Sequence, residues 1–232
     1  MPKAKSIFLD FIRHVVNGDL DEVSRHLAAN PSFANAPSAI GATRQDATTF
    51  FFTEIDHYLY AGDTALHMAA AAFRRPVAER LVAHGADCRA KNRRGAEPIH
   101  YAADTNHWDP KAQAETIAFL VAIGADPNAL DKSGVAPLHR AVRTRSMTAA
   151  RALLDGGANA RAPNKAGSTP LHLAVQNTGR GGSGSDLARQ QQVAIIELLL
   201  ARGAKPTDKD GQGKTVLEAA TSEWVRELLV EL

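Results

Sequence analysis

The heptapeptide Thr64-Ala-Leu-His-Met-Ala-Ala70 decides the fold, because it returns four more times along the chain. The later copies are Glu97-Pro-Ile-His-Tyr-Ala-Ala103, Ala136-Pro-Leu-His-Arg-Ala-Val142, Thr169-Pro-Leu-His-Leu-Ala-Val175 and the degraded Thr215-Val-Leu-Glu-Ala-Ala-Thr221. His67 and His100 are 33 residues apart, and so are Gly134 and Gly167. Self-similarity at a fixed period of this length predicts a solenoid of stacked repeats.

Each copy reads as the start of a helix pair. Thr64 suits an N-cap, and Leu66 and Ala69 then fall on one face of a short helix. Pro76 suits the first turn of a second helix, where its missing N–H costs nothing. Gly85 suits the end of that helix, because glycine readily adopts positive φ. The sequence therefore predicts an all-α chain of helix–turn–helix units.

The recurring T-P-L-H-x-A pattern resembles the ankyrin-repeat family, and the resemblance extends over nearly the whole chain. It implies a single-domain solenoid over 1–232 of about six helix–turn–helix units with hairpin loops. It also implies that the motif histidines brace adjacent turns and that Asn35 and Asn128 brace the loops. Arg89 and Arg161 replace that asparagine, which puts this bond in doubt there. The expected units are an N-terminal capping repeat at 5–35, an inserted hairpin loop at 36–61, repeats at 62–94, 95–133, 134–166 and 167–212, and a C-terminal capping repeat at 213–232.

Three insertions interrupt the repeat spacing. The first adds 21 residues to the hairpin at Ala36–Ala61. The second adds six residues around Asp104–Ala114, and the third adds 13 around Asn177–Gln191. Extended loops on a rigid scaffold are common binding sites.

The composition indicates the expected cellular location of the chain and the charge of its partner. No run of 18 apolar residues is present, so we expect no membrane span. Asp10 and Arg13 interrupt the apolar stretch near the N-terminus, which argues against a secretory signal. Cys88 is the single cysteine, so a reducing cytoplasm is the expected location. Residues 62–167 carry 15 Lys/Arg and 10 Asp/Glu, a net +5 that favours an acidic partner. That excess is too small to indicate a nucleic-acid binder.

The residues with catalytic or metal-binding potential have structural explanations. His67, His100, His139 and His172 occupy one repeat position, too far apart to share a metal. Gly211–Thr215 imitates part of a phosphate-binding loop, but the motif is incomplete. Asp104, His107 and Asp109 lack a companion metal motif. We therefore expect no catalysis, no bound metal and no cofactor.

The aromatic residues of the first insertion leave two interpretations open. Five of the chain's 13 aromatic residues lie here: Phe50, Phe51, Phe52, Tyr58 and Tyr60. They either cover the first repeats as a lid or present an exposed patch that anchors a partner. Trp108 in the second insertion has the same two interpretations.

The resemblance implies a monomeric scaffold that binds an acidic protein through its concave face and hairpin tips. The predicted partner-binding residues are Arg93, Arg94, Tyr101, His107, Trp108, Lys132, Arg140, Arg143, Lys165 and Gln176. An alternative is a small-ligand or enzymatic site built from the inserted loops 36–61 and 104–114, and a third hypothesis is nucleic-acid binding by the basic repeats.

Overall fold

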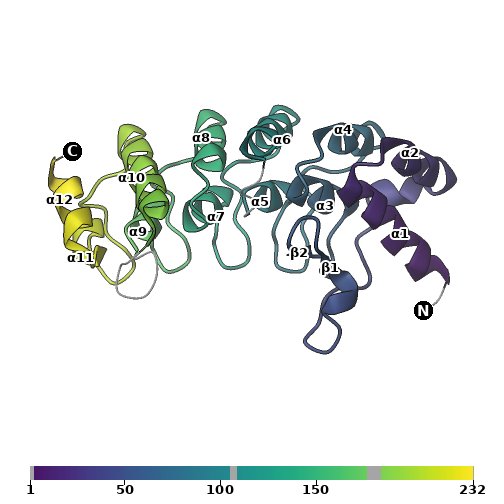
Figure 1. Cartoon of the computed structure of the whole chain (residues 1–232), viewed down its shortest axis with the longest axis horizontal. Coiled ribbons are helices and arrows are strands. Elements are labelled where there is room, and N and C mark those ends of the chain that lie inside the picture. The colour runs from purple at the N-terminus through teal and green to yellow at the C-terminus, as the bar shows by residue number, and fades with distance from the viewer. Residues whose placement is uncertain (1–2, 105–108, 177–183, 232) are drawn as a thin grey trace.

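The computed structural model describes residues 3–104, 109–176 and 184–231 and confirms the all-α solenoid. Figure 1 shows helix pairs stacked side by side from the N-terminus to the C-terminus. In order, the pairs are α1 (Lys3–Asn17) and α2 (Leu20–Ala29), α3 (Ala65–Ala71) and α4 (Arg75–Ala83), α5 (Pro98–Ala102) and α6 (Pro110–Ala122), α7 (Pro137–Arg143) and α8 (Met147–Asp155), α9 (Pro170–Ala174) and α10 (Asp186–Ala201), and α11 (Val216–Ala219) and α12 (Glu223–Glu231).

Two short segments complete the secondary structure. A 3-10 turn, η1 (Pro31–Ala34), follows α2, and a second, η2 (Thr48–Phe50), leads into the only described sheet. That sheet pairs β1 (Phe51–Phe52) with β2 (His57–Tyr58) antiparallel, so that Phe51 faces Tyr58 across the strands. Within the described ranges, no helix is both long enough and apolar enough to cross a membrane.

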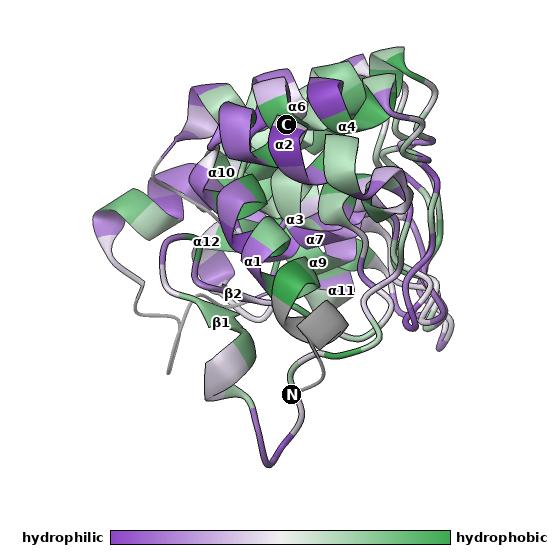
Figure 2. Cartoon of the chain, turned by 90° about the vertical axis from the view of Figure 1, so that its right-hand side faces the viewer, coloured by the Kyte–Doolittle hydropathy of each residue, from purple (hydrophilic) through white to green (hydrophobic). Residues whose placement is uncertain are grey.

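The helices form two rows, and the core lies between them. Helices α3, α5, α7 and α9 line one row, and α4, α6, α8 and α10 line the other (Figure 1). Figure 2 views the stack from its end and shows the hairpin loops projecting together to one side. Each helix of the first row buries its apolar residues, such as Leu66, Ile99, Leu138 and Leu171.

The motif histidines tie each repeat to the next. Nδ1 of His67 accepts a hydrogen bond from the backbone N–H of Thr64 at 3.1 Å. Nε2 of the same ring lies 3.0 Å from the carbonyl oxygen of Ala96 in the following repeat. Because Nδ1 accepts a hydrogen bond, the neutral ring carries its proton on Nε2 and donates it to that carbonyl. The same pair of bonds recurs at His100, His139 and His172. These side chains are therefore structural, as their repeat position indicates.

Glycines open the hairpins because neighbouring tips touch. Gly134 has φ +69°, and a Cβ there would lie 2.7 Å from the backbone nitrogen of Lys165 on the next tip. Only a residue without a side chain permits both that conformation and that approach. The hairpin tips consequently form one continuous row.

The loop-bracing asparagines behave as the resemblance implies, and one arginine partly replaces them. Nδ2 of Asn128 donates to the carbonyl of Gly157 at 3.0 Å, and its Oδ1 accepts from the N–H of Asn159 at 2.7 Å. Nε of Arg89 donates to the carbonyl of Gly124 at 2.7 Å, so it supplies the donor half of the brace. Arg161 instead pairs with Asp208 at 2.6 Å.

The two later insertions are accommodated by buried glutamines. Nε2 of Gln113 on α6 donates to the carbonyl of Ala102 at 2.9 Å. Nε2 of Gln192 on α10 donates to the carbonyl of Ala174 at 2.7 Å. In repeats without an insertion a backbone N–H fills this role, as Arg74 does for Ala69. The glutamines therefore satisfy helix-end carbonyls that the longer connections would leave unpaired.

The first insertion is anchored by its apolar residues. Phe50, Phe52, Ile55 and Leu59 are buried in the core, whereas Phe51 is half-buried. The aromatic run is thus divided between a lid and an accessible side. The lid interpretation holds for Phe50 and Phe52.

This division predicts unequal effects of two neighbouring substitutions. Phe52→Ala should lower the melting temperature by about 4–8 °C, because burying a phenylalanine stabilises by about 2 kcal/mol. Phe51→Ala is the matched control and should lower it by less than half as much. Thermal unfolding followed by far-UV circular dichroism measures both. Equal shifts would contradict the described packing of the insertion.

Candidate partner-binding site

The insertion packs on the third helix pair through a buried polar network. The hydroxyl of Tyr101 donates to Asp63 at 2.7 Å, and Nδ2 of Asn92 donates to the same carboxylate at 2.8 Å. The backbone N–H of Tyr60 donates to the other Asp63 oxygen at 2.7 Å. His57 stacks on the Tyr101 ring, with centroids 4.8 Å apart and planes 18° apart. This network joins the strand β2 to the helix α5.

Tyr101 is consequently not a surface residue. Only 4% of it is exposed, although it was predicted to face a partner. Burial, together with the hydrogen bond to Asp63, raises the pKa of its hydroxyl far above the usual range. The local pattern did not identify this role, because Asp63 and His57 reach Tyr101 from a different repeat and from the insertion.

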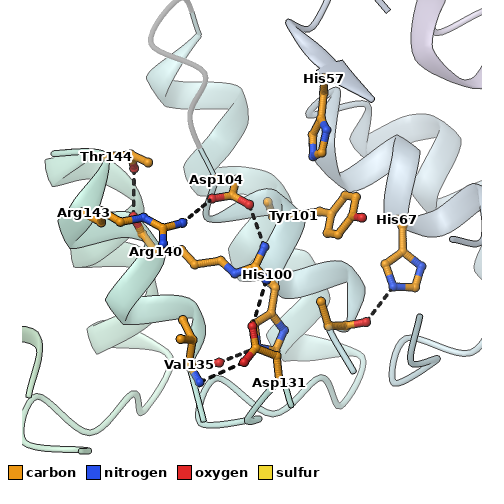
Figure 3. A network of polar contacts seen from close by, with 12 residues as sticks. His57, His67, His100, Tyr101, Asp104, Asp131, Val135, Arg140, Arg143 and Thr144 are labelled. Carbon is orange, nitrogen blue, oxygen red and sulfur yellow. Dashed lines mark hydrogen bonds and ion pairs between the residues drawn. The ribbon is translucent and has the colours of Figure 1, made fainter. Parts of the chain in front are cut away.

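Arg140 is also largely internal, in contrast to the prediction. Its guanidinium lies 2.6 Å from Asp104 and 3.1 Å from Asp131, and its side chain is 12% exposed. Figure 3 shows Arg140 held between these two carboxylates, with Arg143 beside them. Burial works against ionisation of Asp131, but hydrogen bonds from Val135 and Arg140 outweigh it and lower the pKa of that carboxyl. Arg140 therefore fixes repeats to one another instead of presenting charge.

The other described residues of the predicted surface are accessible. The guanidinium of Arg143 makes a long contact of 3.8 Å with Asp104, and its side chain is 63% exposed. Five more are exposed: Arg93, Arg94, Lys132 and Lys165 on the tips, and Gln176 after α9. His107 and Trp108 lie outside the described residues.

The insertion and the hairpin tip that follows α4 line an open pocket that is basic and aromatic, here called the Arg–Tyr pocket. Its volume is about 410 Å³, and it is lined by Ala42, Thr43, Arg44, Ala47, Tyr58, Tyr60, Arg93 and Arg94. The Arg94 guanidinium carbon sits 4.9 Å from the centre of the Tyr60 ring, within cation–π range. Because no carboxylate is among its lining residues, the pocket suits a negatively charged group.

A smaller pocket lies next to it, here called the His57 pocket. It has a volume of about 120 Å³ and shares Tyr60 and Arg94 with the Arg–Tyr pocket; the other lining residues are His57, Asn92, Ala96, Tyr101, Asp104 and Arg140. Nδ1 of His57 accepts the backbone N–H of Tyr58 at 2.8 Å. Its buried Nε2 has no hydrogen-bond partner among the described residues.

The charge and the tautomer of the His57 ring follow from its burial and its contacts. Burial lowers its pKa, so the ring is neutral near pH 7. With Nδ1 accepting a bond, Nε2 carries the proton and is a donor without an acceptor. An unsatisfied buried donor costs free energy that a bound acceptor would recover. The sequence did not indicate this unpaired donor, because the insertion has no repeat pattern that would place His57.

Comparison with models of protein families matches long stretches of the chain and not only the recurring motif. Residues 17–129 and 110–210 match the model of ankyrin repeats in three copies. A search of curated proteins gave no match. Ankyrin repeats are generally protein–protein interaction modules, and the proteins that carry them are typically non-enzymatic. The matched ranges, the recurring histidine bonds and the stacked helix pairs together show that the chain belongs to the ankyrin-repeat family.

Proposed function

We propose that this chain binds an acidic segment of another protein across the Arg–Tyr pocket and the His57 pocket. The observation that carries the proposal is the composition of the Arg–Tyr pocket, in which Arg44, Arg93 and Arg94 surround two tyrosines. Arginine and tyrosine are, with tryptophan, the residues enriched among those that dominate binding energy at protein interfaces. Arginine also pairs with carboxylates through two parallel hydrogen bonds.

Preorganisation supports the same conclusion. Arg94 is held over the face of Tyr60, so less side-chain freedom is lost when a carboxylate binds it. The exposed Lys132 and Lys165 continue the positive charge along the row of tips. A partner that lies along this row would meet positive charge over three successive hairpins. Tyr101 and Arg140 line the His57 pocket, but their polar groups are engaged in internal contacts, so we do not assign them a bond to the partner.

The His57 pocket gives the site a specific position for one acidic side chain. The Nε2–H of His57 and the neighbouring Arg94 are both donors. The Asp104 carboxylate also lines this pocket, but each of its oxygens already lies near an arginine. A volume of about 120 Å³ has room for a carboxylate group with one or two methylenes. We therefore assign an aspartate or glutamate of the partner to this pocket.

The proposed surface can be tested with a library of displayed random peptides selected against the purified chain. Wild-type protein should enrich peptides with clustered Asp and Glu. The double variant Arg93→Glu, Arg94→Glu should bind a selected peptide at least tenfold more weakly in calorimetry, because it reverses two charges at the pocket. Lys111→Glu, at a side chain on α6 that is 87% exposed, is the matched control and should bind with wild-type affinity.

Two results would refute the proposal. Selection of peptides without acidic enrichment would show that the partner chemistry is wrong. Undiminished binding by the Arg93→Glu, Arg94→Glu variant would show that the surface is wrong. Neither arginine is buried, so circular dichroism should show an unchanged fold in both variants.

The role of His57 is tested separately with His57→Phe. Phenylalanine keeps a ring to stack on Tyr101 and removes the Nε2–H donor. A hydrogen bond to a charged group contributes about 1.5–3 kcal/mol, so a selected acidic peptide should lose about tenfold or more in affinity. If affinity is unchanged while Arg94→Glu still weakens binding, the acidic side chain occupies the Arg–Tyr pocket alone.

A further inference from the structure

Two histidines and a carboxylate converge on the first helix pair, outside the surface described above. Asp10 and His14 are one turn apart on α1, and His26 approaches from α2. Oδ2 of Asp10 lies 3.9 Å from Nε2 of His14 and 3.6 Å from Nε2 of His26. All three ligand atoms lie within 4.8 Å of one another.

A fourth residue sets the orientation of His14. Its Nδ1 lies 3.0 Å from Oδ2 of Asp19, in the turn between the two helices. With its Nδ1–H donated to that carboxylate, the neutral ring directs the Nε2 lone pair toward Asp10 and His26. Histidines that bind metal ions almost always donate their other N–H in this way, which fixes the tautomer and makes the ligand more basic.

The second histidine is held by packing. The His26 ring packs on Phe11 with centroids 5.7 Å apart, and on the His14 ring at 5.6 Å. The side chains of His14 and His26 are 26% and 16% exposed, whereas Asp10 is 55% exposed. The cluster therefore has a partly buried nitrogen side and an open carboxylate side.

We propose that Asp10, His14 and His26 bind a divalent transition-metal ion, with zinc as the best fit. Two imidazole nitrogens and one carboxylate are a ligand set that zinc accepts in proteins, with water in the fourth position. Ligands at bond lengths of about 2.0–2.1 Å in a tetrahedron lie about 3.4 Å apart. The observed separations of 3.6 and 3.9 Å are within about half an ångström of that geometry, and the two histidine nitrogens lie within 4.8 Å of each other.

The ion would stabilise the terminal unit. This unit has no copy of the motif histidine that ties other repeats together. A metal bound by α1 and α2 would join its two helices, and a ligand that binds only the folded state raises stability. We expected no metal because the motif histidines have structural roles and the set in the second insertion lacks a companion motif. His14 and His26 are 12 residues apart and follow no known metal motif, so the sequence did not single them out. The only local sign was the Asp10-x-x-x-His14 spacing on one helix face.

The test is calorimetric titration of zinc chloride into untagged, chelator-stripped protein. We expect one ion per chain and a melting temperature that rises with zinc. His14→Ala and His26→Ala should each weaken binding at least thirtyfold. Asp19→Asn, which touches no metal in this proposal, should weaken it about 10–100-fold. His84→Ala, an exposed histidine at the end of α4, and Cys88→Ala are the controls and should bind as wild type does.

Other outcomes would overturn the assignment. Absence of a zinc-dependent melting shift in wild-type protein, or wild-type affinity in both His14→Ala and His26→Ala, would leave only an Asp–His ion-pair cluster. If a histidine variant fails to fold, Asp10→Asn gives the decisive result, because this residue lies on the exposed side of the cluster. Undiminished zinc affinity in Asp10→Asn would refute the proposed ligand set.

Discussion

Arg140→Ala should lower the free energy of unfolding by about 3–5 kcal/mol, the usual cost of removing one member of a buried charge cluster. The substitution leaves Asp104 and Asp131 without the cation that they share, and their side chains are only 24% and 9% exposed. Three different segments lose their common contact: α7, the hairpin tip before it and the start of the second insertion. Urea denaturation followed by circular dichroism measures the loss.

Arg143→Ala provides the comparison within the same helix. It removes an exposed arginine at 3.8 Å from Asp104, and exposed ion pairs contribute about 0.2–1 kcal/mol. A loss below about 1 kcal/mol in both variants would contradict the internal role of Arg140. The contrast also has a practical consequence, because a charge reversal at Arg140 would weaken partner binding simply by unfolding the repeat.

The sequence was a good guide wherever a residue's role recurs at the repeat period. Pro76 lies in the first turn of a helix, Gly134 opens a hairpin and His67 bonds across to the next repeat, as their positions indicate. These roles depend on contacts within one repeat or with its immediate neighbour, so that each copy of the motif carries the same information.

The candidate site depends on contacts between different repeats and the first insertion, and these contacts do not recur at the repeat period. Tyr101 and Arg140 occupy inner-helix positions that are usually exposed, but Asp63, Asp104 and the first insertion bury them. The aromatic run of the insertion gave the correct location without the orientation, because side chains alternate across β1 and only one side meets the core. The three ligands of the proposed metal site likewise meet through the packing of α1 on α2.

Acid should destabilise this chain well before its carboxylates titrate. Burial lowers the pKa of His100 to about 4, against 6.5 for an unburied histidine. Burial also lowers the pKa of His67 and His139, whose rings make the same bonds. Each ring donates from Nε2 and accepts at Nδ1, so a proton on Nδ1 would remove the bond within its own repeat.

The direction in which stability changes with pH follows from proton uptake by the folded and unfolded chains. Between pH 6.5 and about 4 the unfolded chain binds a proton at His100 and the folded chain does not, so stability falls as the pH falls through this window. His100 alone should account for about 2 kcal/mol between pH 7.5 and 5, and for about 3 kcal/mol by pH 4. His67 and His139 add losses of the same sign. Glu97 opposes them, because burial raises the pKa of its carboxyl.

Urea denaturation of wild-type protein and of His100→Gln at several pH values between 7.5 and 5 tests this prediction. Glutamine does not titrate, so the variant should be less stable at pH 7.5 and should lose about 2 kcal/mol less than wild type on acidification. Equal slopes in the two proteins would mean that His100 takes up its proton in the folded state as readily as in the unfolded one. The bond that its Nδ1 accepts from the backbone N–H of Glu97 would then be dispensable, and the histidines would not account for any acid sensitivity of the solenoid.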